Sequence, residues 1–294
     1  MYKLGIDLGG TKIEGIILDD NKKELFRRRI ATEQEYGYEH ILKNIKSLYK
    51  QLLEKINSKE HTLGIGTPGS ISKQSGLMRN SNTTSLNGRP LKKDLQELLG
   101  RNFILQNDAN CFALAEALSG AGKGYDMVFG VIMGTGCGGG IIYKGEILRG
   151  LQDIGGEWGH MSINPNGPQC YCGSRGCVET YISGGGLQRL YEEEFKKKAS
   201  FVEIVEEYYS DEPNVKQFME HFFNNYGRSM ANLINILDPD IVVLGGGVSN
   251  FDELYNKGTE AVEKYIFSDS FYTPIVKNRL GDSAGVIGAA LMGK

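Results

Sequence analysis

One histidine and three cysteines lie close together in a segment rich in glycine and polar residues, namely His160, Cys170, Cys172 and Cys177. Zn²⁺ binds imidazole and thiolate ligands, and four protein ligands leave no coordination position for a reactive water. The cluster therefore predicts a structural metal site that holds its loop in one conformation. Buried cysteines without a metal, or a disulfide, are the alternatives, but the neighbouring cysteines of a Cys-x-Cys pair are poorly spaced to bridge each other.

The same loop carries two carboxylates, Glu157 and Glu179, each within a few residues of a predicted ligand. A loop clamped by a metal would hold these acids in fixed positions, so together with His160 they predict a rigid polar site. Cys111 and Cys137 lie in apolar or glycine-rich surroundings. We expect both to be packing residues and not ligands.

Two glycine turns elsewhere share the pattern of strand, Gly-Thr turn and strand. The first joins strands predicted over residues 2–8 and 13–18, and the second joins strands predicted over residues 131–133 and 141–143. Their candidate phosphate-binding residues are Asp7, Gly9, Gly10, Thr11 and Lys12 in the first turn and Gly134, Thr135 and Gly136 in the second, where the loop is expected to continue through Gly140. Turn N–H groups and threonine hydroxyls bind phosphate oxygens, although a plain tight turn has the same sequence signature. The repetition predicts a duplicated chain whose two lobes enclose a nucleotide.

An acid lies at a predicted strand-to-helix junction. A strand is predicted over residues 103–105, and a helix that ends near residue 118 follows the sequence Asn107-Asp108-Ala109-Asn110. Open α/β sheets bind ligands at the carboxyl ends of their strands, which makes Asp108 a candidate for chemistry. Capping of the helix is the alternative role for Asp108, although Asn107 and Asn110 could cap it instead.

A third glycine loop, formed by Gly245, Gly246 and Gly247, follows a buried strand predicted over residues 241–244 and precedes a helix expected near Phe251. It predicts the place where the adenosine and α-phosphate end of a nucleotide passes, with a bare strand-to-helix connection as the alternative. The polar loop over residues 70–90 is either a mobile connection or a surface that recognises hydroxyl groups. The remaining expected elements are a strand over residues 63–66 and helices over residues 36–56, 187–197, 201–209 and 214–237, with a terminal helix after residue 283.

The length of 294 residues predicts two lobes. We expect one lobe over residues 1–118, completed by the C-terminal helix at 284–294, and a larger lobe over residues 119–283 that contains the metal loop. A net charge of -3 gives no reason to expect nucleic acid or an anionic membrane, so small molecules are the expected partners. The chain shows neither a secretory leader pattern nor an apolar run long enough to cross a bilayer, which predicts a cytoplasmic location.

Together these segments resemble the bacterial ROK family of sugar kinases over essentially the whole chain. The matching segments are residues 6–12, 107–110, 134–140, 156–160, the cysteine cluster up to residue 179, and residues 237–240 leading into the third glycine loop. The resemblance implies an α/β, two-lobed fold of the actin, Hsp70 and hexokinase (ribonuclease H-like) group with a structural zinc loop. It also implies that Asp108 is the catalytic base, and that the sugar is bound by Asn82, Asn107, Glu157, His160 and Glu179.

The activity implied by the resemblance is transfer of the γ-phosphoryl group of MgATP to a sugar hydroxyl, most often O6. The resemblance also implies that the protein is a homodimer. Residues 68–72 and 82–88 look most like the fructokinase or mannokinase branch, whereas residues 107–116 and 138–140 look equally like the N-acetylglucosamine kinase branch. We expect fructose or mannose, because the 70–90 loop would lie against the sugar. An N-acetylglucosamine kinase and a glucokinase are the alternatives.

Two alternatives without kinase activity are a ROK-type transcriptional regulator and a catalytically silent sugar sensor. A regulator needs a DNA-binding domain and a basic face, whereas this sequence begins at the first predicted strand and is slightly acidic. A silent sensor would lack the base, but Asp108 is present. Both are therefore disfavoured.

Overall fold

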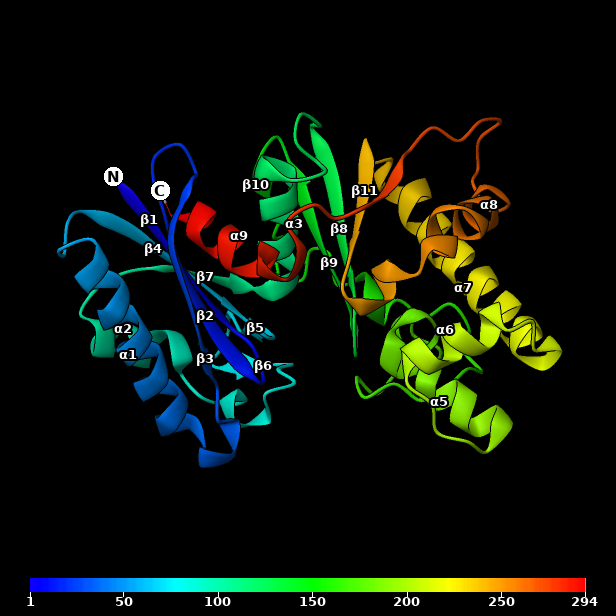
Figure 1. Ribbon diagram of the computed structural model, residues 1–294, viewed down its shortest axis with the longest axis horizontal. Helices are drawn as coiled ribbons and strands as arrows, with labels where there is room; N and C mark the ends of the chain where they lie inside the picture. The colour runs from blue at the N-terminus through cyan, green and yellow to red at the C-terminus, as the bar shows by residue number, and fades with distance from the viewer. Residues whose placement is uncertain (294) are drawn as a thin grey trace. The chain divides into compact units, whose positions relative to one another are not determined.

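The computed structural model describes residues 1–293 and contains two compact α/β units, each built around a five-stranded sheet (Figure 1). Unit 1 comprises residues 1–116, 149–155 and the described chain from residue 280 onward. Unit 2 comprises residues 117–148 and 156–279. Residues 149–155 and 280–283, which we expected in the larger lobe, lie in unit 1, and residues 117–118, which we expected in the first lobe, lie in unit 2.

The sheet of unit 1 has the strand order β3-β2-β1-β4-β7. Its strands are β1 (Tyr2–Leu8), β2 (Lys12–Leu18), β3 (Glu24–Ala31), β4 (His61–Thr67) and β7 (Ile104–Asn107). β1 pairs antiparallel with β2 and parallel with β4, which in turn pairs parallel with β7. The strands predicted from the sequence are confirmed, but β3 was missed because this mostly exposed edge strand carries three consecutive arginines instead of an apolar alternation.

Helices cover both faces of this sheet. On one face of the sheet, α1 (Tyr38–Lys55) and Ile17 belong to the larger of two apolar clusters of this unit. On the other face, Ile16 packs against α9 (Ala284–Met292) in the smaller cluster. Gly5 in β1 permits this second contact, because a Cβ at that position would lie 2.3 Å from the carbonyl oxygen of Val286. The other elements described in or reaching into this unit are η1 (Gln34–Tyr36), β5 (Ser70–Ile71), β6 (Met78–Arg79), η2 (Thr84–Leu86), α2 (Leu91–Leu99), α3 (Asp108–Ser119) and η6 (Gly281–Ser283).

The sheet of unit 2 has the order β10-β9-β8-β11-β12, which repeats the order found in unit 1 and confirms the predicted duplication. Its strands are β8 (Met127–Met133), β9 (Cys137–Tyr143), β10 (Glu146–Ile147), β11 (Ile241–Gly245) and β12 (Ile275–Lys277). The turn between β8 and β9 is shorter than predicted. Residues 138–140 pair with β8 as part of β9, because their glycines form a regular antiparallel ladder instead of a loop.

The helices of unit 2 contribute to a hydrophobic core that is rich in aromatic residues. They are α4 (Glu179–Ile182), α5 (Gly184–Phe195), α6 (Phe201–Tyr209), α7 (Pro213–Leu237) and α8 (Lys257–Glu263). The three long helices predicted in this part of the chain are confirmed. The helix expected near Phe251 is wrong: that segment forms two short 3₁₀ turns, η4 (Gly247–Asn250) and η5 (Asp252–Tyr255), whereas η3 (Trp158–His160) lies in the metal loop.

α7 is the longest described helix, with 25 residues. Its buried residues recur along one side and face the aromatic core, while charged and polar residues occupy the rest. Within the described chain, residues 1–293, no helix combines the length and the apolar character that a membrane span requires.

A histidine-centred cluster joins the start of β4 to α1 and to the segment after α2. His61 Nε2 lies 2.9 Å from Tyr49 Oη, and Arg101 Nη2 donates to the His61 carbonyl oxygen at 2.8 Å. The Arg101 guanidinium also contacts the His61 ring. Burial lowers the pKa of His61, a hydrogen bond with the Lys59 carbonyl partly opposes this, and the charge of Arg101 lowers the pKa further.

We expect this cluster to weaken unit 1 as the pH falls. The folded-state pKa of His61 is below its ordinary value of about 6.5, so the unfolded chain binds the additional proton more readily. The contribution of His61 to the free energy of unfolding is therefore fully present above about pH 6.5 and is lost as the pH falls below that value. Urea midpoints from about pH 7.5 to 5.5 should decrease less for His61→Gln than for the wild type. His221→Gln, at an exposed site on α7, is the control, and equal slopes for all three proteins would contradict the prediction.

Candidate functional site

The turn between β1 and β2 is fixed by backbone and side-chain hydrogen bonds. Gly9 N–H donates to the Lys12 carbonyl at 2.9 Å, and Thr32 Oγ1 donates to the Gly9 carbonyl at 2.7 Å. Thr32 N–H donates to the Thr11 carbonyl at 3.0 Å. Thr11 is exposed and Gly10 is partly exposed, so part of the turn is accessible to a ligand. All five residues predicted for this turn therefore lie on one hairpin.

Asp7 lies near the end of β1, among other acids. The pKa of Asp7 is raised to about 7, mainly by burial; the negative charges of Asp108 and Glu14 contribute to the rise, and the positive charges of Lys12 and Arg29 oppose it. A carboxyl group that is about half protonated near neutral pH becomes fully charged when a cation binds beside it. Divalent cations such as Mg²⁺ prefer carboxylate oxygens, so Asp7 and its acidic neighbours fit such an ion.

Asp108 begins α3 directly after β7. Asn107 Oδ1 accepts a hydrogen bond from Asn110 N–H at 2.8 Å, which is the N-cap interaction of this helix. Asp108 Oδ1 accepts from the adjacent Ala109 N–H at 2.8 Å, and the Asp108 side chain is exposed. The cap is thus provided by Asn107, and the alternative that Asp108 occupies the N-cap position is not supported.

The polar loop over residues 70–90 is ordered by short local elements. It contains the β5–β6 hairpin and η2, and Asn87 fixes its middle. Ser81 N–H donates to Asn87 Oδ1 at 2.9 Å, and Asn87 Nδ2 donates to the Ser81 carbonyl at 2.9 Å. Asn82, the residue predicted to contact a sugar, is exposed on this loop. This organisation favours a surface that recognises a ligand over a mobile connection.

The predicted metal ligands come together in unit 2. One ligand atom from each of His160, Cys170, Cys172 and Cys177 lies within 4.8 Å of all the others. Cys170 Sγ lies 3.7 Å from His160 Nδ1, and Cys172 Sγ lies 3.6 Å from Cys177 Sγ. Tetrahedral zinc with bonds of about 2.3 Å to sulfur and about 2.0 Å to nitrogen requires ligand separations of roughly 3.5 to 3.8 Å. The donor set therefore fits a structural zinc ion.

The two nitrogens of His160 have different neighbours. Nδ1 faces Cys170 Sγ, whereas Nε2 lies 3.0 Å from Tyr171 Oη. The two ring nitrogens are distinct groups, so one can bind a metal while the other forms a hydrogen bond. Tyr171 is a site residue that the sequence analysis missed. Its position between Cys170 and Cys172 was the available signal, because any residue there lies beside the metal ligands.

Glu179 joins the metal loop to the β8–β9 hairpin. Its side chain is buried, and Oε2 accepts a hydrogen bond from Cys137 N–H at 2.9 Å. A Cβ at Gly136 would lie 2.5 Å from the same oxygen, so a side chain at this turn position would displace the carboxylate from its hydrogen bond. Glu157 is exposed before η3, where Trp158 Nε1 donates to the Gly138 carbonyl at 3.1 Å. Both predicted carboxylates thus stand on a segment that packs against β9.

A cavity of about 610 Å³ lies within unit 2. Gly134 and Thr135 of the β8–β9 turn line one part of it, and Gly247 lines another, together with residues from the starts of α5 and α6. A Cβ at Gly134 or Gly247 would meet no atom within 4 Å. Two glycine loops that are distant in sequence therefore face one cavity. Gly246 instead packs against β8, with a φ of 80° and a Cβ position 2.4 Å from the Met133 carbonyl oxygen.

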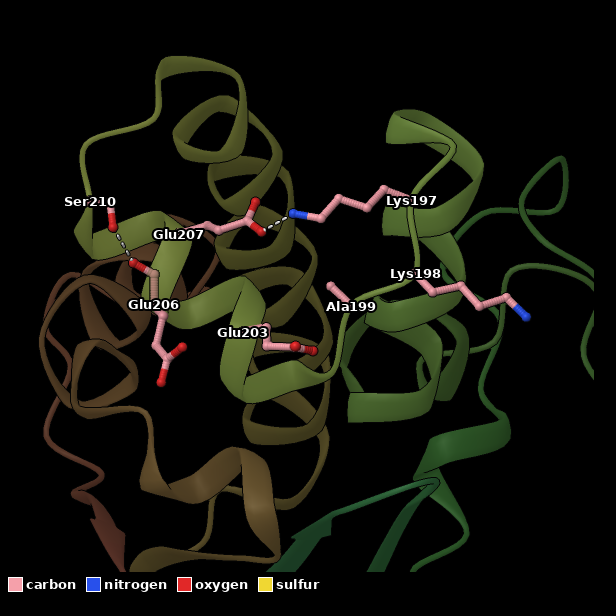
Figure 2. A pocket seen from close by; sticks show the side chains of 7 residues that line it. All are labelled: Lys197, Lys198, Ala199, Glu203, Glu206, Glu207 and Ser210. Carbon is pink, nitrogen blue, oxygen red and sulfur yellow. Dashed lines mark hydrogen bonds and ion pairs between the residues drawn. The ribbon is translucent and has the colours of Figure 1, made fainter.

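A second, smaller hollow of about 290 Å³ lies between the end of α5 and α6 (Figure 2). Its lining is mostly charged, and Figure 2 shows Lys197 reaching toward Glu207, with which it forms an ion pair. Ser210 Oγ donates to the Glu206 carbonyl at 2.9 Å. None of the predicted site residues lines this hollow. Its main charges are already paired, and it suggests no ligand.

Comparison with known proteins places the chain in a family. Residues 3–294 match the sequence model of the ROK family. An N-acetyl-D-glucosamine kinase of Vibrio atlanticus (strain LGP32) is 37% identical over 298 residues, covering 98% of this chain and 98% of that protein. The corresponding enzyme of Histophilus somni (strain 129Pt) is 36% identical over 299 residues, covering 98% of this chain and 97% of that protein.

Solved structures confirm the expected fold. A ROK hexokinase from Thermus thermophilus has a TM-score of 0.90 and 32% identity, covering 100% of this chain and 98% of that chain. A ROK family glucokinase from Streptomyces griseus, in complex with glucose and AMPPNP, has a TM-score of 0.80 and 26% identity, covering 100% and 99%. A ROK family transcriptional regulator has a TM-score of 0.81 at 21% identity, and this chain covers 77% of it, so that likeness concerns the fold alone.

We expect Gly247→Ala to weaken nucleotide binding without disturbing the fold. The added methyl group meets no protein atom within 4 Å, but it extends into the 610 Å³ cavity. Crowding of this kind should raise the Kd for ADP about tenfold while the melting temperature stays near that of the wild type. Isothermal titration calorimetry measures the Kd, and Ser210→Ala in the hollow of Figure 2 is the control. An unchanged Kd for Gly247→Ala would remove this cavity from nucleotide binding.

Proposed function

We propose that this chain, which belongs to the ROK family and is an ATP-dependent sugar kinase, phosphorylates N-acetyl-D-glucosamine. The observation that supports this acceptor is the name shared by relatives that are 36–37% identical over nearly the whole chain. Our expectation of fructose or mannose is not supported, and the N-acetylglucosamine alternative is. A hydroxyl-rich loop such as residues 70–90 suits many sugars, so its composition was a poor guide to the acceptor.

Asp108 is the proposed base of the reaction. The attacking sugar hydroxyl, which we assign to O6, forms a bond from its oxygen to the γ-phosphorus while the bond between that phosphorus and the β–γ bridging oxygen breaks. The hydroxyl proton passes to Asp108, and ADP leaves. The exposure of the Asp108 side chain and the use of Asn107 as the helix cap support this role.

ATP is the proposed ligand of the 610 Å³ cavity and of the glycine turns. Gly134, Thr135 and Gly247 line the cavity, which has more apolar than polar surface and so suits an adenine ring and its ribose. The β1–β2 turn would bind phosphate oxygens through its N–H groups. Mg²⁺ would be held with the participation of Asp7, and it would neutralise the charge of the transferred phosphoryl group.

Zinc is the proposed metal of the loop. Bound to the three cysteines and to His160 Nδ1, it would fix the segment that carries Glu157 and Glu179. These acids are suited to hold sugar hydroxyls through charge-assisted hydrogen bonds, and His160 Nε2 would do so by exchanging Tyr171 Oη, 3.0 Å away, for a sugar hydroxyl. Because Glu179 Oε2 already accepts from Cys137 N–H, we assign the sugar contact to Oε1. Asn82 and the amide group of Asn107 complete the proposed sugar-binding set.

The alternative to a kinase is a protein without catalytic activity, either a ROK-type transcriptional regulator or a silent sugar sensor. Structural likeness to a ROK transcriptional regulator is compatible with it, but the more similar relatives are named kinases, and Asp108 is present. The homodimer implied by the family resemblance and the cytoplasmic location predicted from the sequence pattern both stay predictions. No observation within residues 1–293 favours nucleic acid as a partner, and the net charge of -3 argues against it.

A coupled ADP-release assay tests the acceptor. We expect kcat/KM for N-acetylglucosamine to exceed the values for fructose, mannose, glucose and N-acetylmannosamine by about tenfold or more, equivalent to about 1.4 kcal/mol of transition-state discrimination. Asp108→Asn, measured in parallel, should lose turnover by about a hundredfold or more and still bind the sugar. A preference for fructose or mannose, or no turnover with N-acetylglucosamine, would contradict the proposed acceptor.

Removal of one predicted zinc ligand should weaken binding of the sugar and leave binding of the nucleotide nearly unchanged. We expect Cys172→Ser to lose bound zinc, because only three ligands remain, and to raise KM for the sugar about tenfold or more. The Kd for ADP should change little, because no zinc ligand lines the 610 Å³ cavity. Metal content is measured by mass spectrometry, with Cys111→Ala, outside the ligand set, as its control. Wild-type zinc content in Cys172→Ser would refute the assigned ligands.

A further inference from the structure

Thr83 is a buried residue whose hydroxyl group has no hydrogen-bond partner among residues 1–293. Its backbone is well fixed: Thr83 N–H donates to Ser81 Oγ at 3.1 Å, and Leu86 N–H donates to the Thr83 carbonyl at 3.0 Å. Thr83 precedes the short helix η2, but its side chain does not cap that helix. The residue is thus held in place while its hydroxyl group is unused.

An unpaired buried hydroxyl is unfavourable, because it loses its hydrogen bonds to water on folding and gains none in return. A valine would fill nearly the same space without this cost. The hydroxyl of Thr83 therefore needs an explanation outside the folding of unit 1. A ligand that supplies the missing partner is such an explanation.

The Thr83 hydroxyl borders the first glycine turn. A Cβ built on Gly10 would lie 3.5 Å from Thr83 Oγ1 and 3.9 Å from Gln34 Nε2. Gln34 is exposed on η1, so its side chain is able to move aside without disturbing the core. The Thr83 hydroxyl and the Gln34 amide therefore border the position that a side chain at Gly10 would occupy, and both groups can donate a hydrogen bond there.

The same turn follows Asp7, whose carboxyl group interacts electrostatically with that of Asp108. Under the proposed function, Asp7 acts with the cation of MgATP and Asp108 receives the proton of the sugar hydroxyl. The group that must pass close to both acids is the transferred phosphoryl group. Its oxygens only accept hydrogen bonds, whereas the Thr83 hydroxyl can donate one.

We propose that the Thr83 hydroxyl donates a hydrogen bond to an oxygen of the phosphoryl group as that group passes from ATP to the sugar. This inference rests on the proposed kinase function and adds a residue to it. The sugar oxygen bonds to the γ-phosphorus, the bond from that phosphorus to the ADP oxygen breaks, and Asp108 takes the sugar proton. Thr83 keeps its own proton throughout and stabilises the charge on the transferred group.

The inference also distinguishes two neighbours on the polar loop. Asn82 is exposed, and the family resemblance implies that it contacts the sugar, whereas Thr83 is buried and borders the phosphate-binding turn. A loop that recognises the sugar with one residue and the phosphoryl group with the next would align acceptor and donor. Under this inference, the 70–90 loop contributes to phosphoryl transfer as well as to recognition of the sugar.

Thr83→Val and Thr83→Ser test this role. For Thr83→Val we expect kcat to fall about 10- to 100-fold, KM for sugar and for ATP to change less than about threefold, and the melting temperature to equal or exceed that of the wild type. Thr83→Ser keeps the hydroxyl and should retain kcat within about fivefold. Opposite effects of Thr83→Val on turnover and stability are expected only if the hydroxyl serves a ligand.

Thr62→Val is the matched control. Thr62 is a second buried threonine of unit 1 whose Oγ1 has no partner among the described residues. It pairs with Lys3, whereas Asp7 pairs with Gly66, so Thr62 lies four positions away from the acid along the strands, or about 13 Å. Thr62→Val should match the wild type in kcat and be at least as stable.

The outcomes separate this inference from the proposed function. Wild-type kcat in Thr83→Val overturns the inference, as does a loss confined to KM for the sugar, which would place the hydroxyl on the sugar instead. Parallel losses of kcat and melting temperature in both Thr83 variants also overturn it, because they indicate a packing role. A wild-type protein inactive toward every sugar tested would instead contradict the proposed function.

Discussion

The hydrogen bond from Cys137 N–H to the buried Glu179 carboxylate connects the two features that dominate unit 2. Glu179 directly follows the last segment of the metal loop, and Cys137 begins β9, the second strand of the β8–β9 hairpin. A charged acceptor inside the protein is stable only when donors satisfy it. The position of the metal loop is therefore tied to the hairpin by this hydrogen bond, and the glycine at position 136 leaves room for the accepting oxygen.

Unit 1 depends on charge in a different way. Its first hairpin holds Asp7 opposite Glu14 in the strand register, and Arg29 donates to Glu14 at 2.8 Å. The arginine offsets part of the negative charge, but the pKa of Asp7 still rises to about 7 because burial and the nearby Asp108 dominate. An acidic cluster of this kind is unfavourable in isolation. A bound cation would relieve this repulsion, which is the basis of our proposal that Asp7 acts with the cation of MgATP.

Much of the architecture was predictable because its signals are local. Apolar runs, glycine turns and helical periodicity gave the strands flanking both hairpins, the long helices and the duplication. The four candidate ligands of the metal loop followed from residue type and spacing alone. Other features were not local. β3 owes its place to pairing with β2, and residues 138–140 belong to β9 because β8 supplies partners, which neither segment reveals by itself. Thr83 and Tyr171 gain significance only from their neighbours in space, Gly10 and His160.

The contact between α9 and the sheet of unit 1 also constrains the order in which the chain can fold. Gly5 and Gly64 expose backbone on the face that α9 covers, and the carbonyl oxygen of Ala289 would lie 1.9 Å from a Cβ at Gly64. The N-terminal strands are synthesised first, but their apolar and glycine-rich face stays uncovered until residues 284–292 leave the ribosome. Unit 2, whose two segments both lie between residues 117 and 279, is available to fold earlier. Unit 1, whose strands are synthesised first, is thus the unit that completes its fold last.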